Sequence, residues 1–451
     1  MKSAIVLAAG KGTRMKSSKN KVMHEVLGKP MIGHVVDRLS SIDVDEVVMV
    51  VGHQASAIQD YLKDRVIYAM QEPQQGTGHA VMQATALEGK SGDTLILYGD
   101  CPLISVETMK TMFEHNQGKA LTVLTAVLED PAQYGRIVRD EQGNILKIVE
   151  FKDASDEERK IKEINTGIYC VSNGLLFKHL ADLTNDNVQK EYYLTDLVEI
   201  FAKHRYDVQG LVVEDINEVM GVNDRFDLLK ASNWLQNKIN TRLMQEGVTF
   251  IDPKATYVDE DVVIGEDTIL YPNVYITSGS VLGKRNEILP NTMIHNSQIG
   301  DDNVIDSSRI MDSRIDNDVT VGPFAHLRNG TVIESKNRIG NFVEFKNSRL
   351  GFDSRCAHLT YVGDADVGSK VNFGCGVVTV NYDGKNKFKT IIKDGAFIGS
   401  NVNLIAPITV GENAVVAAGT TANKDVLDGE MAIGRSRQEN KTGYGLKYKK
   451  K

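Results

Sequence analysis

The sequence predicts an α/β domain with a Rossmann-like, mostly parallel sheet, followed by a parallel β-helix of hexapeptide repeats. Three observations lead to this prediction. The chain has 451 residues, more than one hydrophobic core normally serves. Short apolar runs alternate with helical patterns in its first half. In its second half, aliphatic residues recur at a spacing of six, as Val258, Ile264, Leu270, Ile276, Leu282, Ile288 and Ile294.

The first half alternates candidate strands and helices, which is typical of an α/β domain. Residues 3–9 form an apolar run bounded by glycine and predict a buried first strand. The other predicted elements are strands at 46–51, 66–69, 94–98 and 121–128 and helices at 31–41 and 78–87. Ligands of such sheets bind beyond the carboxyl ends of the strands, so we expect a site in the loops after Ala9 and Tyr98.

A connecting helix is expected between the two domains. From residue 224 to 246 the apolar side chains fall mostly on one helical face, and Gly247 is the expected stop. These side chains are Phe226, Leu229, Trp234, Leu235, Ile239, Leu243 and Met244. We therefore expect domains at 1–223 and 251–451, joined by a segment at 224–250.

The period of six predicts a β-helix rather than an α-helix, which repeats near 3.6. If every sixth residue points inward, the chain coils as a triangular prism with three short flat sides in each coil. The period returns in shifted register at Val321, Leu327, Ile333, Ile339 and Phe345, and again at Ile392, Ile398, Leu404, Val410 and Val416. About ten coils are expected between residues 251 and 425. A β-sandwich with a chance period is the alternative.

Glycine follows the inward aliphatic residue in many hexads. The pattern occurs at Gly265, Gly283, Gly300, Gly340, Gly351, Gly399 and Gly411. We expect these glycines to form tight corners between the flat sides, because a corner suits a residue without Cβ.

Composition argues against several classes of function. The net charge of −8 and the pI near 5.8 give no electrostatic case for a nucleic-acid partner. No apolar run approaches the ~20 residues of a membrane span, and the first residues make a poor signal peptide. The four cysteines lack metal-like or disulfide-dense spacing, which favours a reducing cytoplasm. The basic tail at 447–451 is expected to be a solvated end, with a binding arm as the alternative.

A glycine loop with several cations follows the first predicted strand. It reads Gly10-Lys11-Gly12-Thr13-Arg14-Met15. Met15 stands where a dinucleotide-binding loop has its third glycine, and no GxxxxGK[ST] phosphate loop is present. The cations are Lys11, Arg14, Lys16, Lys19 and Lys21. Backbone N–H groups of a glycine turn, together with several cations, suit a polyphosphate, whereas a solvated basic loop is the alternative.

This loop opens a series of motifs that resembles a known family. Residues 7–15, with Lys21 after them, look like the signature of sugar-1-phosphate nucleotidyltransferases. The further motifs, in that family's order, are Gln71, Gln75-Gly76-Thr77-Gly78-His79-Ala80, Tyr98-Gly99-Asp100-Cys101-Pro102-Leu103, Tyr134-Gly135-Arg136-Ile137, Glu150, Asn165-Thr166-Gly167 and Gly221-Val222-Asn223-Asp224. Together with the hexapeptide repeats, the whole chain resembles the bifunctional N-acetylglucosamine-1-phosphate uridyltransferase and glucosamine-1-phosphate acetyltransferase family, whose β-helix is left-handed.

The resemblance implies a site for UTP and UDP-N-acetylglucosamine in the first half. The uracil would be held by Ala8, Gly10, Gln71, Gly76 and Thr77, the phosphates by Arg14 and Lys21, and the sugar by Gly135, Glu150, Asn165 and Asn223. Leu7, Ala9, Tyr98 and Gly99 would complete the site. Asp100 and Asn223 would hold Mg²⁺, a hard cation that takes oxygen ligands and keeps waters.

Polar residues interrupt the aliphatic pattern of the second half between Arg328 and Gly384, which costs burial energy unless they face a site. Residues 372–376 and 381–384 resemble the acetyltransferase motif of the same family. The resemblance implies that His358 is the general base, a role that suits histidine near neutral pH. It also implies that Arg328 and Lys346 bind the sugar phosphate, and Tyr361 and Asn372 the sugar.

The resemblance also implies a site for acetyl-CoA. The backbone N–H of Cys375 would face the developing oxyanion, and the coenzyme would lie along Asn381, Tyr382, Ser400, Ala418 and Arg435. Cys375 and Val377 depart from the family pattern. Cys375 as an acyl-carrying nucleophile is an alternative, although no electropositive helix end is evident beside it. Whether Glu344 orients His358 or is an ordinary strand-end glutamate stays open.

The resemblance implies a cytoplasmic homotrimer with two activities, acetyl transfer to glucosamine-1-phosphate and then uridylyl transfer to the product. Two other hypotheses remain open from the sequence. One is a glucose-1-phosphate nucleotidyltransferase with a regulatory solenoid, and the other is a non-catalytic trimeric scaffold that senses nucleotide sugars.

Overall fold

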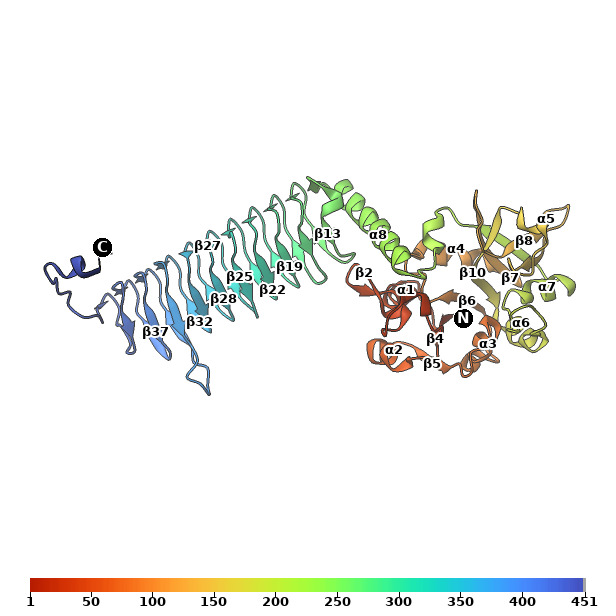
Figure 1. Cartoon of the computed structure of the whole chain (residues 1–451), viewed down its shortest axis with the longest axis horizontal. Coiled ribbons are helices and arrows are strands. Elements are labelled where there is room, and N and C mark those ends of the chain that lie inside the picture. The colour runs from red at the N-terminus through yellow and green to blue at the C-terminus, as the bar shows by residue number, and fades with distance from the viewer. Residues whose placement is uncertain (449–451) are drawn as a thin grey trace. The chain divides into compact units, whose positions relative to one another are not determined.

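The computed structural model divides into two compact units, Met1–Leu235 and Gln236–Lys451 (Figure 1). It describes residues 1–448, so Lys449, Lys450 and Lys451 of the predicted basic tail lie outside the described residues. Within the described part, no helix is long and apolar enough to cross a membrane.

The first unit is built on one mixed, mostly parallel sheet with the strand order β11-β7-β10-β6-β1-β4-β5. Its strands are β1 Lys2–Ala8, β4 Glu46–Val51, β5 Ile67–Met70, β6 Asp93–Tyr98, β7 Leu121–Val127, β8 Arg136–Arg139, β9 Ile145–Val149, β10 Glu163–Ser172 and β11 Val208–Val212, and β2 Glu25–Val26 pairs separately with β3 Lys29–Pro30. The five predicted strands are confirmed, each to within two residues. β10 runs antiparallel to its neighbours β6 and β7 and carries the β8–β9 hairpin.

Helices flank this sheet, and both of its faces are buried. The helices of this unit are α1 Met31–Ser40, α2 Ala55–Leu62, α3 Thr77–Met82, α4 Val106–Asn116, α5 Asp156–Arg159, α6 Asn173–His179 and α7 Asp196–Lys203, and α8 Arg225–Gln245 runs across the boundary between the units. Alternate residues of β1 enter opposite cores, Val6 on one face and Ile5 on the other. This two-sided burial explains why the strand is a continuous apolar run. The predicted helix at 78–87 is wrong in length, because Ala84 leaves the helical region (φ −78°, ψ 42°) and a separate 3₁₀ turn follows at Thr85–Leu87.

The expected connecting helix exists as α8, but its apolar face is narrower than predicted. Leu235, Ile239 and Leu243, spaced four apart, are buried, whereas Phe226 and Leu229 are exposed. Met244, also predicted on the face, is exposed as well. Gly247 has a φ of +95° and its N–H bonds back to Met244 at 3.1 Å, as expected of a glycine that ends a helix.

The second unit is built on three parallel sheets, and from β12 to β40 consecutive strands belong to the first, second and third sheet in turn. The first sheet contains β12 Thr249–Phe250, β15 Ile269–Leu270, β18 Glu287–Ile288, β21 Val304–Ile305, β24 Thr320–Val321, β27 Arg338–Asn341, β30 Arg355–His358, β33 Asn372–Phe373, β36 Phe397–Ile398, β39 Val415–Val416 and β41 Met431–Ala432. The second contains β13 Tyr257–Val258, β16 Tyr275–Ile276, β19 Met293–His295, β22 Arg309–Met311, β25 His326–Arg328, β28 Glu344–Lys346, β31 Tyr361–Gly363, β34 Val378–Val380, β37 Asn403–Ile405 and β40 Thr421–Ala422. The third contains β14 Val263–Ile264, β17 Val281–Leu282, β20 Gln298–Ile299, β23 Arg314–Ile315, β26 Val332–Ile333, β29 Arg349–Leu350, β32 Ala365–Val367, β35 Thr390–Ile392 and β38 Ile408–Val410.

This arrangement is the predicted parallel β-helix, and Figure 1 shows its stacked coils. The inward residues of all three predicted registers are buried, each at most 4% exposed. Neighbouring strands in each sheet are parallel, for example β27 with β30 and β25 with β28. The β-sandwich alternative is therefore wrong, because its sheets would contain antiparallel neighbours.

The glycines after the inward residues have a different purpose from the one predicted. Their φ values are not in the left-handed region, which non-glycine corner residues such as Asp302 and Asn291 occupy instead. A Cβ at Gly265 would lie 2.7 Å from the backbone of Gly283, and one at Gly340 would lie 1.9 Å from the carbonyl oxygen of Ala357. Glycine is needed because the next coil passes too close for a side chain.

Candidate functional site

A cavity of about 510 Å³ opens at the carboxyl ends of the central strands of the first unit. Twelve of the residues predicted to bind the nucleotide line it, namely Leu7, Ala8, Ala9, Gly10, Arg14, Lys21, Gln71, Gly76, Thr77, Tyr98, Asp100 and Asn223. They come from the end of β1 and the long loop after it, the loop before α3 and the start of α3, the end of β6 and the segment before α8. This is the edge of the sheet where the loops after Ala9 and Tyr98 were expected to form a site.

Two cationic side chains, Arg14 and Lys21, and two oxygen acceptors, on Asp100 and Asn223, meet in this cavity. The Lys21 ammonium donates to Asp100 Oδ2 and, at 2.9 Å, to Asn223 Oδ1, which also accepts from Arg14 Nη2 at 2.8 Å. A Cβ at Gly12 would lie 2.5 Å from Lys21 Cβ, so the glycine lets the loop pass directly over this lysine. Two side chains far apart in sequence, Asp100 and Asn223, thus converge on one positive charge.

Hydrogen bonds and close packing hold the residues at the predicted uracil end of the cavity. Gln71 is buried, and its Nε2 donates to the carbonyl oxygen of Gly76 at 2.9 Å. Gly76 has a φ of +107°, and a Cβ there would lie 2.5 Å from the carbonyl oxygen of Tyr192. Thr77 Oγ1 accepts from the N–H of Leu194 at 3.1 Å. Close packing therefore fixes the residues predicted to face the base.

The remaining predicted residues, Gly99, Gly135, Glu150 and Asn165, are not part of the cavity lining. Asn165 is fixed on both sides, because its Nδ2 donates to the Tyr169 hydroxyl at 2.8 Å and its Oδ1 accepts from Gly167 N at 3.0 Å. A Cβ at Gly135 would lie 3.5 Å from both Glu150 oxygens, so glycine leaves open space beside that carboxyl. Burial is the main cause that raises the pKa of Glu150.

The lining also includes Lys11, Gly12 and Thr13 of the predicted polyphosphate loop and Ala80 of a quoted motif. Val22, Gln74 and Glu191 line the cavity without having been predicted. Gln74 could have been predicted from the sequence, since it lies beside the motif that begins at Gln75. Its Nε2 donates to the carbonyl oxygen of Ala9 at 3.3 Å. Glu191 carried no sequence signal, because it reaches the site through the packing of its loop against the Gly76 turn.

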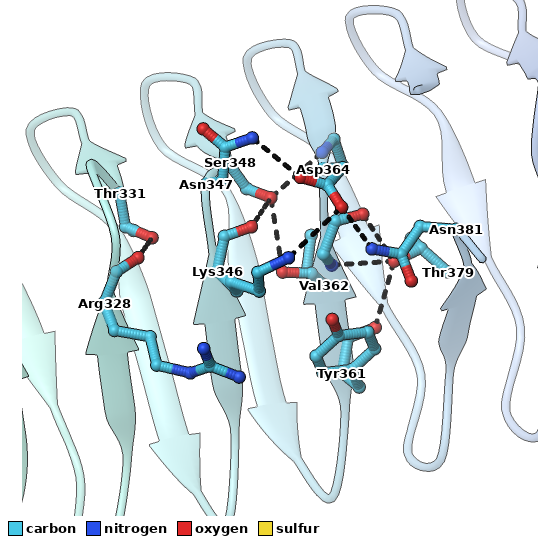
Figure 2. A network of polar contacts seen from close by, with 12 residues as sticks. Arg328, Thr331, Lys346, Asn347, Ser348, Tyr361, Val362, Asp364, Thr379 and Asn381 are labelled. Carbon is cyan, nitrogen blue, oxygen red and sulfur yellow. Dashed lines mark hydrogen bonds and ion pairs between the residues drawn. The ribbon is translucent and has the colours of Figure 1, made fainter. Parts of the chain in front are cut away.

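In the second unit, the predicted residues Arg328, Lys346 and Tyr361 lie on successive strands of the second sheet, and we call these three side chains the row (Figure 2). Arg328 and Lys346 are register partners on β25 and β28. The register partner of Lys346 on β31 is Gly363, and a Cβ there would lie 2.3 Å from the Tyr361 hydroxyl. The missing side chain at Gly363 thus leaves room for the Tyr361 hydroxyl to stand beside Lys346.

His358 belongs to a second group, which we call the corner column, at the end of the first sheet. Its members are Asn341, His358, Cys375, Ser400 and Ala418, each two residues after an inward residue on successive coils. Backbone bonds join the coils, from Asn401 N to Cys375 O and from Gly419 N to Ser400 O, both at 2.8 Å. The structure therefore brings three of the predicted acetyl-CoA residues into line with His358.

The environment of His358 is open and polar. Its side chain is exposed, and Nδ1 lies 2.9 Å from Asn341 Oδ1. Glu344 instead accepts from Arg328 Nε and Nη2, at 2.8 and 2.6 Å, so Asn341 rather than Glu344 is the hydrogen-bond partner of His358. Within residues 1–448, the Cys375 N–H has no acceptor, as an oxyanion donor requires.

The last predicted residues lie in different places. Asn372, on the first sheet, pairs in register with Arg355 and not with the row. Asn381 and Tyr382 begin a projecting hairpin in which the Tyr382 hydroxyl donates to Gly384 O at 2.7 Å. Arg435 Nη1 donates to the carbonyl oxygen of Ala418 and so extends the corner column.

Comparisons with known proteins agree with both units. Residues 4–190 match the MobA-like NTP transferase domain, and residues 389–424 match the bacterial transferase hexapeptide family. The chain is 51% identical over 444 residues to the bifunctional protein GlmU of an Exiguobacterium species, covering 98% of both chains. It is 50% identical over 451 residues to the bifunctional protein GlmU of Brevibacillus brevis, covering 99% of this chain and 98% of that protein.

A solved structure of UDP-glucose pyrophosphorylase complexed with UDP-glucose is 20% identical and covers 53% of this chain and 99% of its own, with a TM-score of 0.43. A likeness this distant supports no argument. The GlmU proteins, in contrast, match across both units. The hypotheses of a purely regulatory solenoid and of a non-catalytic scaffold are therefore wrong, because both units match transferase domains. With its nucleotidyltransferase unit and its left-handed hexapeptide β-helix, the chain belongs to the bifunctional GlmU family.

Proposed function

We propose that the two groups of residues described above are the two active sites of an enzyme that makes UDP-N-acetylglucosamine. The chain is a transferase with a nucleotidyltransferase and a hexapeptide acetyltransferase activity. The β-helix transfers the acetyl group of acetyl-CoA to glucosamine-1-phosphate. The first unit then joins the product to the uridylyl group of UTP and releases pyrophosphate. The observation that carries the residue assignment is the convergence of Arg14, Lys21, Asp100 and Asn223 in one cavity.

In the uridylyl transfer, a phosphate oxygen of N-acetylglucosamine-1-phosphate attacks the α-phosphorus of UTP, and the bond to pyrophosphate breaks. The protein aligns the two anions and neutralises their charge. Arg14 and Lys21 lie where the triphosphate would enter beside the glycine loop. Gln71 and the backbone around Gly76 would hold the uracil, and Gly135, Glu150 and Asn165 would contact the sugar.

Asp100 and Asn223 fit a magnesium ion. Both offer oxygen, the ligand type that Mg²⁺ prefers, and both already contact one cation, the Lys21 ammonium. Among the described residues there is no cluster of three or more His, Cys, Asp or Glu side chains, so substrate oxygens and water would complete the shell. Bound there, the ion would supply positive charge to the phosphates.

In the acetyl transfer, the amine of glucosamine-1-phosphate attacks the thioester carbon and the thiolate of coenzyme A leaves. His358 takes the proton from the amine at Nε2, since Asn341 lies on Nδ1. The free N–H of Cys375 would donate to the oxyanion. The row of Arg328, Lys346 and Tyr361 would hold the sugar phosphate, and Ser400, Ala418 and Arg435 would border the coenzyme.

We also propose a cytoplasmic homotrimer. The four cysteines are free, as expected in a reducing compartment. Asn372 and the row of Arg328 and Lys346 lie on different sheets of one chain, which supports an acetyl-transfer site shared between copies. Sedimentation should give three times the 49.7 kDa mass of one chain, and a single-chain mass would contradict the trimer.

A coupled assay with both substrate pairs tests the two-site proposal. Asp100→Ala should remove pyrophosphate release from UTP and N-acetylglucosamine-1-phosphate while acetyl transfer continues. His358→Ala should remove acetyl transfer alone, with Leu359→Ala, an exposed neighbour, as its control. If either Asp100→Ala or His358→Ala abolished both reactions in folded protein, the separation of the sites would be wrong.

A further inference from the structure

Asp364, which has no role in the sites described so far, is the centre of a polar network beside the row (Figure 2). Its Oδ2 accepts from Lys346 Nζ at 3.4 Å and from Asn381 Nδ2. Its Oδ1 accepts from Asn347 Nδ2 at 2.7 Å. One carboxylate therefore joins a residue proposed to bind the sugar phosphate to the hairpin proposed to border acetyl-CoA.

The network is largely shielded from solvent. The side chains of Lys346 and Asp364 are 13% and 12% exposed, and Asn381 is buried. Burial alone would raise the pKa of Asp364, but the hydrogen bonds from Asn347 and Asn381 and the charge of Lys346 lower it. The carboxylate is therefore ionised at neutral pH and forms charge-assisted hydrogen bonds, which are stronger than neutral ones.

The backbone holds Asp364 firmly in place. It occupies a corner with a φ of +48°, a conformation that Asp and Asn tolerate better than most residues. Its N–H donates to the carbonyl oxygen of Lys346 at 3.0 Å, and its own carbonyl oxygen accepts from Thr390 N at 3.1 Å. A fixed anion can therefore restrain the long, flexible side chain of Lys346.

A lysine ammonium has three N–H donors. The contact with Asp364 uses one of them and leaves donors for a phosphate. Ordering a flexible lysine in advance removes an entropy cost that substrate binding would otherwise bear. We infer that Asp364 is a positioning residue of the acetyl-transfer site, which holds the Lys346 ammonium where the sugar phosphate binds. This inference rests on the proposed role of Lys346.

The neighbouring Asp366 provides a matched control. It also pairs with cations, Arg349 at 3.2 Å and Lys389 at 3.1 Å, but it lies on the third sheet and contacts none of the proposed site residues. Its side chain is 40% exposed. Loss of its charge therefore changes a similar ion pair without touching Lys346.

The test measures acetyl-transfer kinetics of full-length Asp364→Asn, Asp366→Asn, Lys346→Ala and the Lys346→Ala/Asp364→Asn double variant. Asp364→Asn should raise KM for glucosamine-1-phosphate about 10-fold, the size expected for losing a hydrogen bond to a charged group, and leave kcat within about 2-fold. Asp366→Asn should change neither by more than about 2-fold. In the Lys346→Ala background, Asp364→Asn should add nothing, because residues that act through one contact are not additive.

Three results would overturn the inference: an unchanged KM in Asp364→Asn, an equal rise in Asp366→Asn, or rises that multiply in the double variant. If Lys346→Ala itself left KM unchanged, the proposed function of the row would fail first, which separates the two failures. Uridylyl transfer by the same preparations should stay constant. Thermal unfolding followed by circular dichroism should stay within about 3 °C of the parent protein. If Asp364→Asn alone fails to fold, Asp364 is a folding residue and the inference is wrong.

Discussion

Gly340→Ala tests whether the spacing between coils controls the chemistry at His358. Gly340 lies in β27 beside Asn341, and its coil packs against the one that carries Ala357 and His358. Its φ is outside the left-handed region, so alanine is allowed by the backbone. Any effect of the substitution must therefore come from the contact between coils.

The size of the effect follows from that contact. The new Cβ would lie 1.9 Å from Ala357 O and 2.6 Å from Ala357 C, where ordinary contacts begin at 3.4 Å. Backbone atoms cannot rotate away, so the two coils must separate beside His358. Overpacking of this kind costs about 1–3 kcal/mol of folding free energy. A misplacement of about 1 Å at a reacting group can cost about 100-fold in rate.

The assay compares kcat for acetyl transfer with the free energy of unfolding in guanidinium. Gly340→Ala should lower both, while uridylyl transfer stays unchanged. Gly265→Ala is the matched control, because its Cβ would lie 2.7 Å from the Gly283 backbone in the first coils of the β-helix. It should destabilise the β-helix and leave kcat intact. Equal losses of kcat in both variants, or none in Gly340→Ala, would refute the reasoning.

Two further predictions concern single side chains. Asn341→Ala removes the partner of His358 Nδ1 and should lower kcat for acetyl transfer about 10-fold, as the loss of one hydrogen bond allows. An unchanged kcat would show that Asn341 does not orient His358, the proposed base. Burial raises the pKa of Glu150, so the folded state holds this proton more tightly than the unfolded chain. The free energy of unfolding should then fall as the pH rises above the usual carboxyl range, and Glu150→Gln should remove that fall. Urea titrations followed by the fluorescence of Trp234, the single tryptophan, measure the free energy of unfolding of the first unit. The same pH dependence in the parent protein and in Glu150→Gln would contradict the prediction.

The fold was predictable where burial imposes a period. Most inward positions of the β-helix are aliphatic residues that recur at a spacing of six within each register, because each coil can be buried only by its neighbours. The face of α8 was less predictable, since Phe226 and Leu229 are apolar yet exposed. The role of the hexad glycines was also hidden, because a sequence does not show how closely the next coil passes.

The place of the first-unit cavity was predictable because the loops after Ala9 and Tyr98 follow strand ends in one sheet, whereas most of its individual residues, such as Gln71 and Asn223, were predicted from the family resemblance. Glu191 was not predictable, since only the packing of its loop against the Gly76 turn brings it into the cavity lining. In the β-helix, Asn341 could have been found by position. It stands two residues after the inward Ile339, as His358 stands two residues after the inward Cys356. A residue at the equivalent place one coil earlier is therefore the neighbour to expect beside the proposed catalytic residue His358.

The β-helix suits an extended coenzyme for a geometric reason. Equivalent positions on successive coils are stacked about 4.8 Å apart, the spacing of neighbouring strands. His358, Cys375, Ser400 and Ala418 are such positions, so a ligand that lies along them meets one residue per coil. The repeat specifies only the inward residues, and these outward positions are free to vary without disturbing the core. A line of binding residues can therefore be assembled along a corner with no change to the fold that holds it.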